Sequence, residues 1–72
     1  MHANTHRDRE LNARVIEVLP QMGLAWVVSE DQHEWALSRS LPGLNLQQLQ
    51  PGQQLTLTLR TQHGMELPTG CH

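Results

Sequence analysis

The chain has 72 residues, which is enough for one small domain and too few for an enzyme with a large enclosed cleft. Hydrophobic residues make up 38% of it and charged residues only 17%, a composition that excludes a fully disordered chain. Five arginines, no lysine and seven acidic residues give a formal net charge of −2. That balance excludes a domain that holds phosphates mainly through overall positive charge.

The cellular compartment is indicated by what the sequence lacks. Cys71 is the single cysteine, so no internal disulfide can form, which points to a reducing cytoplasm. No apolar run reaches 18 residues, so we expect no membrane span. The polar N-terminal stretch has no apolar centre of the kind that a secretory signal carries. We therefore expect a cytoplasmic protein.

The first half of the chain predicts an arm followed by three strands. Positions 1–10 hold almost no apolar side chain, so we expect a disordered N-terminal arm and a single domain over 11–72. Branched apolar residues predict a strand over Val15–Leu19, which ends at Pro20 in a turn. Two further strands are expected over Leu24–Val28 and His33–Leu37, separated by a polar turn.

The second half predicts a loop and two more strands. Two Pro-Gly pairs break the pattern between positions 38 and 52, and Leu46–Leu49 between them fits one short helical turn. Leu55–Leu59 alternates leucine with threonine, which is typical of a strand with one face in the core. Met65–Leu67 predicts a short last strand before Pro68.

These elements together predict an all-β fold. Apart from the long loop, they recur about every ten residues, as in a small sandwich or barrel. Five strands with one short helical turn between strands 3 and 4 fit a small barrel of the oligonucleotide-binding (OB) type. An SH3-like barrel is the alternative.

Three short stretches resemble bacterial translation initiation factor 1. They are V-I-E-V-L-P (Val15–Pro20), H-E-W-A-L-S (His33–Ser38) and L-Q-P-G-Q-Q-L-T-L-T-L (Leu49–Leu59), and the similarity covers roughly positions 13 to 60. The resemblance implies an OB fold that binds RNA. It does not extend to the basic stretch that follows the third strand in that family, because Arg39 is the one cation between Trp35 and Leu59.

The chain is also similar to a cold-shock domain. Gly23–Val27 stands where that family has its Gly-aromatic-Gly-aromatic-apolar motif, and Leu49–Leu55 matches it again. This resemblance implies binding of single-stranded nucleic acid on an aromatic face. Leu24, Glu17, Glu34 and Ala36 replace aromatic or histidine residues of that face, so that only Trp26 remains.

The candidate binding residues follow from these patterns. Trp26 could stack on an unpaired base, with Leu24 as a second apolar contact. The alternative is that Trp26 packs in the core, since Ala25 on the opposite face is apolar too. Trp35 shares a strand face with Leu37, so we expect it in the core.

Three arginines are the candidate phosphate contacts. Arg14 lies in a basic cluster before the first strand, and Arg39 and Arg60 could join it across the barrel. A guanidinium pairs with phosphate oxygens and stacks on bases. The alternative is that all three are ordinary solvated surface charges.

No motif indicates catalysis, a metal or a cofactor. The histidines lack the spacing of zinc ligands, and no nucleophile stands beside a base. We therefore expect no enzyme, no metal site and no cofactor. Two functions stay open: weak binding of single-stranded RNA or DNA, or a protein-interaction module that keeps the barrel.

Overall fold

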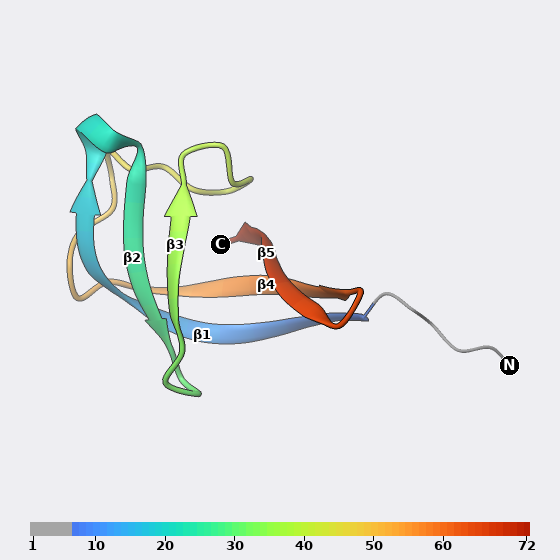
Figure 1. Ribbon diagram of the computed structural model, residues 1–72. Coiled ribbons are helices and arrows are strands. Elements are labelled where there is room, and N and C mark those ends of the chain that lie inside the picture. Colours follow the sequence, from blue (N-terminus) through green and yellow to red (C-terminus); the bar gives the residue numbers. More distant parts are fainter. Residues whose placement is uncertain (1–6) are drawn as a thin grey trace, which may run out of the picture.

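A computed structural model describes residues 7–72 of the protein (Figure 1). It contains five strands and one short 3-10 helix. In chain order these are β1 (Arg7–Leu19), η1 (Pro20–Met22), β2 (Leu24–Ser29), β3 (Glu34–Ser38), β4 (Gln54–Gln62) and β5 (Met65–Cys71). None of the helical segments between residues 7 and 72 has the length and apolar character to cross a bilayer.

All five strands belong to one antiparallel sheet with the order β3-β2-β1-β4-β5. The long strand β1 stands at its centre and pairs with β4 through 7–14 and with β2 through 13–19. Figure 1 shows β1 bending strongly between these two halves, which curls the sheet. The register with β2 shifts between Val15 and Glu17, so that Ile16 is the extra residue of a β-bulge. The sheet thus forms a nearly closed barrel, and the predicted all-β, five-stranded fold is confirmed.

The barrel is open between β3 and β5, the two edges of the sheet. Pro68 lies in β5 and has no N–H to donate, and the register of β5 shifts beside it. A proline and an irregular register are both typical of an edge strand, and β5 forms no ladder with β3. The loop after β3 instead covers the end of β5, where the Cys71 N–H donates to the Pro42 carbonyl at 3.0 Å.

The core is built from the alternating inward side chains of the strands. Leu57 and Leu59 of β4 are fully buried, as their alternation with threonine predicts. Val15, Ala25, Val27 and Leu37 complete the centre of the barrel. Trp35 packs against this cluster half-buried and donates its Nε1–H to the Ser29 hydroxyl at 3.1 Å, which confirms its expected place.

Several element boundaries differ from the predicted ones, and that of β1 differs most. Strand β1 begins at Arg7, so positions 7–10 of the predicted arm are strand paired with β4, and positions 1–6 lie outside the described residues. Strand β5 continues through Pro68 to Cys71, which is buried rather than frayed. The turn predicted over Leu46–Leu49 is present as an i→i+3 hydrogen bond of 3.4 Å without a regular helix.

Candidate nucleic-acid interface

Trp26 projects from the outer face of the barrel. Its neighbours Ala25 and Val27 on β2 are completely buried, so alternation turns the indole outward, and Trp26 is 37% exposed. Its cross-strand partners are Ala36 on β3 and Glu17 on β1. Because Ala36 is small, one side of the indole is left uncovered. The sequence left open whether Trp26 lies in the core, and the structure places it outside.

The β-bulge widens the apolar surface beside Trp26. Where β1 has one extra residue, both Ile16 and Glu17 are exposed, and Ile16 is 47% exposed. Leu24 and Val28 extend the same surface along β2 and are half-buried. We call the residues Ile16, Leu24, Trp26 and Val28 the outer patch. Ile16 was missed in the sequence because a bulge leaves no signature in strand alternation.

Arg14 lies at one end of the outer patch. It is the cross-strand partner of Val28, and cross-strand partners share a face of the sheet. Its side chain makes no ion pair with any described residue. Arg14 is therefore the predicted phosphate contact that the register places on the same face as Trp26, next to Val28 and at the opposite end of β2 from Leu24.

Arg39 lies at the end of the barrel instead. Its backbone N–H donates to the Gly23 carbonyl at 2.9 Å, and its guanidinium lies over Gly23, whose missing side chain leaves room for it. Arg39 and Pro20 line a shallow cavity together with the loop over 44–47. It therefore lies beyond the Leu24 end of the outer patch, at the opposite end of β2 from Arg14.

Arg60 is far from the outer patch and already paired. Its Nε lies 2.9 Å from Oδ1 of Asp8, its partner on β1. Asp8 is six residues from Arg14 along β1, or about 20 Å at the rise of a strand. Arg60 therefore does not belong to the surface around Trp26.

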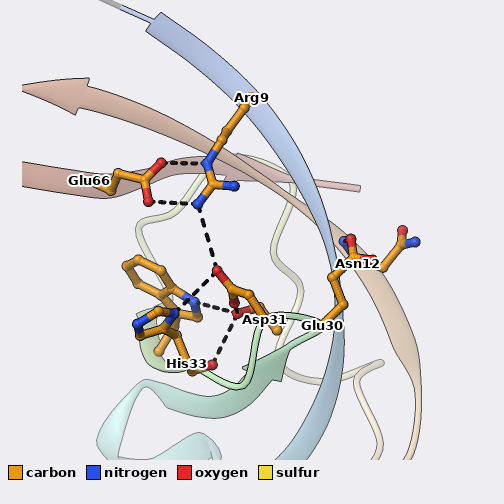
Figure 2. Close-up of polar contacts among 8 residues, drawn as sticks. Arg9, Asn12, Glu30, Asp31, His33 and Glu66 are labelled. Atoms are coloured by element: carbon orange, nitrogen blue, oxygen red, sulfur yellow. Dashed lines mark hydrogen bonds and ion pairs between the residues drawn. The ribbon is translucent and has the colours of Figure 1, made fainter.

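A polar cluster at the other end of the barrel was also missed in the sequence. Figure 2 shows Arg9 of β1 between two carboxylates: its Nε and terminal nitrogen lie 2.5 and 2.7 Å from the Glu66 oxygens of β5. The same guanidinium lies 3.7 Å from Asp31, which also contacts His33 at 3.2 Å. We call Arg9, Asp31, His33 and Glu66 the clasp, because it joins β1, β5 and the turn between β2 and β3.

Hydrogen bonds set the charge state of the clasp. The Ser29 hydroxyl and then His33 donate to Asp31 and lower the pKa of this carboxyl from 3.8 to about 2. The hydrogen bonds from Arg9 lower the pKa of Glu66. Both carboxylates are therefore charged at neutral pH and hold the Arg9 guanidinium, which is not available to a phosphate.

Two further observations concern possible metal sites and known relatives. Between residues 7 and 72, no three His, Cys, Asp or Glu side chains are grouped so that they could hold a metal ion. Comparison of the chain with family models, with curated proteins and with solved structures gave no match. The outer patch with Arg14 is therefore the surface on which a function has to be argued.

Proposed function

We propose that this protein is a small cytoplasmic OB-type barrel that binds single-stranded RNA or DNA weakly through the outer patch. The observation that carries the proposal is the outward indole of Trp26, exposed on an open sheet face with Arg14 on the same face. An exposed indole can stack on any unpaired base, which is worth roughly 1–3 kcal/mol per base. Arg14 supplies a charge for the adjoining phosphate.

The binding is expected to be weak and only slightly dependent on salt. One aromatic platform and one arginine on the outer face give few contacts, and Glu17 and Glu34 lie on the same face. A dissociation constant on the order of 10⁻⁴ M is reasonable for binding of this kind. With one or two phosphates contacted, log K should fall with log [salt] with a slope of about −0.7 to −1.4.

The test is a titration with short single-stranded oligonucleotides at low salt. Trp26→Ala should abolish binding while leaving the fold intact, because the indole lies outside the core. Arg60→Gln is the control that removes a positive charge away from the outer patch, since Arg60 is paired with Asp8. Equal loss of binding in Arg60→Gln and Trp26→Ala would place the nucleic acid elsewhere.

A protein partner is the second candidate. It is favoured by Ile16, which adds an exposed aliphatic side chain beside Trp26, with the carboxylates of Glu17 and Glu34 next to the patch. An apolar surface bordered by acids suits a protein with basic side chains better than a polyanion. Capture of a protein from lysate that survives nuclease and is lost in Ile16→Ser would favour this function over nucleic-acid binding.

A further inference from the structure

We propose that a surface cavity formed by the paired strands β1 and β2, the turn after β2 and Gln54 of β4, at the end of the outer patch, binds one guanine base of the strand that stacks on Trp26. This inference rests on the proposed function and adds to it a base preference. It starts from an open surface cavity of about 190 Å³, lined in part by exposed residues of the outer face such as Arg14 and Glu30. Since one water molecule occupies roughly 30 Å³ of liquid, the cavity equals about six waters, which is the size class of a single nucleobase.

The cavity is continuous with the outer patch. Its lining consists of two strand segments and the polar side chains around them: Asn12, Ala13, Arg14, Val28, Ser29, Glu30, Gln32 and Gln54. Val28 belongs to both the cavity and the outer patch. It lines the cavity, and it follows Trp26 by two residues on the same face of β2. Two residues of a strand span about 7 Å. A base next to the one stacked on Trp26 can therefore enter the cavity.

The hydrogen-bond acceptor in the cavity is the Glu30 carboxylate, which is held by the backbone of Asn12. The Glu30 N–H donates to the Asn12 carbonyl at 2.9 Å, and the Asn12 N–H donates back to Oε1 of Glu30 at 3.0 Å (Figure 2). This reciprocal pair extends the β1–β2 ladder by one step. It holds the carboxylate at the wall of the cavity, and Glu30 makes no ion pair with any described residue.

A carboxylate can distinguish one base from another by the N–H donors that the base presents. An ionised glutamate only accepts hydrogen bonds. It therefore binds a base edge that presents adjacent N–H donors and repels a base edge that presents acceptor lone pairs. Among the four bases, only guanine presents two adjacent N–H donors on its Watson–Crick edge, N1–H and N2–H. Arg14 and the amide of Gln54 on the same walls can donate to guanine O6 or N7. The negative charge of Glu30 also opposes a phosphate in the cavity, so the base and not the backbone enters it.

The experiment compares oligothymidylate hexamers that carry one central guanosine, inosine, adenosine or cytidine. Binding is followed by amide and indole NMR shifts at low salt. The guanosine hexamer should bind roughly tenfold tighter than the adenosine and cytidine hexamers, as two charge-assisted hydrogen bonds at a solvated site predict. Inosine lacks the N2 amino group and should lie between them.

Two variants separate hydrogen bonding by Glu30 from the general effect of one negative charge on the outer face. Glu30→Gln keeps an oxygen for the Asn12 N–H but loses the acceptor pair, so the guanosine preference should fall below twofold. Glu34→Gln removes an equal charge from the same outer face outside the cavity. It should tighten binding of all hexamers by one common factor and keep the preference.

The outcomes distinguish the two proposals. Equal affinity for all hexamers, with the Trp26 indole still shifting, would overturn the guanine site and leave the proposed function standing. Loss of the preference in Glu34→Gln would place base selection outside this cavity. The absence of any shift with any hexamer would overturn both.

Discussion

At the level of single residues, Gly43 is needed for a close backbone contact, whereas Gly52 is needed only for the conformation of a turn. Each follows a proline in the loop between β3 and β4, and each has a left-handed backbone, with φ of +87° and +89°. A side chain on Gly52 would meet nothing within 4 Å, whereas a Cβ on Gly43 would lie 1.9 Å from the Cys71 carbonyl oxygen. Gly43 therefore allows the loop to reach the edge of β5, and Gly52 only forms a turn.

The two alanine variants of these glycines should differ in stability. Gly52→Ala should lower the free energy of unfolding by about 1–2 kcal/mol, the cost of the left-handed conformation for a residue with a Cβ. Gly43→Ala should cost at least about 4 kcal/mol, because the loop has to leave β5 and the Cys71 N–H loses its partner. Urea unfolding of both variants checks this, and equal losses would mean that the contact between the loop and β5 contributes nothing.

At the scale of elements, the clasp connects parts of the barrel that backbone ladders do not join. Strand β5 and the turn between β2 and β3 lie at opposite edges of the sheet, and Arg9 contacts a carboxylate on each. Ion pairs at an exposed site are individually weak, but the paired geometry between Arg9 and Glu66 makes this one stronger than most. The clasp therefore links, through side chains, two edges of the sheet that no backbone ladder joins.

The clasp predicts how stability depends on pH. Folding lowers the pKa values of Glu66 and Asp31, so the folded state holds these protons less tightly than the unfolded chain does. Their contribution is present above the unfolded pKa of about 4 and is lost as the pH falls toward 2. The urea midpoint should therefore decrease between pH 4 and pH 2.

A matched pair of variants tests the source of that decrease. Glu66→Gln should lower the midpoint at pH 5 and flatten its decline toward pH 2, because one of the two carboxyls is gone. Glu34→Gln, which removes a carboxylate outside the clasp, should keep the wild-type slope. An unchanged slope in Glu66→Gln would show that the Arg9–Glu66 pair does not couple proton binding to folding.

At the scale of the whole molecule, local patterns could be predicted from the sequence and long-range ones could not. Alternation over Leu55–Leu59 and the turn residues around Pro20 predicted strands and turns correctly, because these features depend on neighbouring residues. The bulge at Ile16 and the pairing of Arg9 with Glu66 depend on residues brought together only by the curled sheet. For the same reason the cavity beside Arg14 could not be predicted, since its walls come from three separate stretches of chain.

Pairing of charges across the barrel also explains why the affinity should be low. Arg9 and Arg60 are each held by carboxylates, and Arg39 lies at the barrel end. Of the arginines whose side chains the structure describes, this leaves Arg14 on the face of the outer patch. The sequence placed Arg14, Arg39 and Arg60 in one group of candidates because it shows neither pairing nor distance.

The central claim is that an indole on the outer face of the barrel meets the ligand, and the two tryptophans provide an internal comparison. Trp35 is half-buried with its Nε1–H bonded to Ser29, whereas Trp26 is exposed on the outer face. In a ¹⁵N–¹H spectrum the two indole resonances can be followed separately while a single-stranded hexamer is added. We predict that the Trp26 resonance shifts with the hexamer concentration and that the Trp35 resonance stays in place. A stationary Trp26 resonance at saturating hexamer, or a shift confined to Trp35, would contradict it.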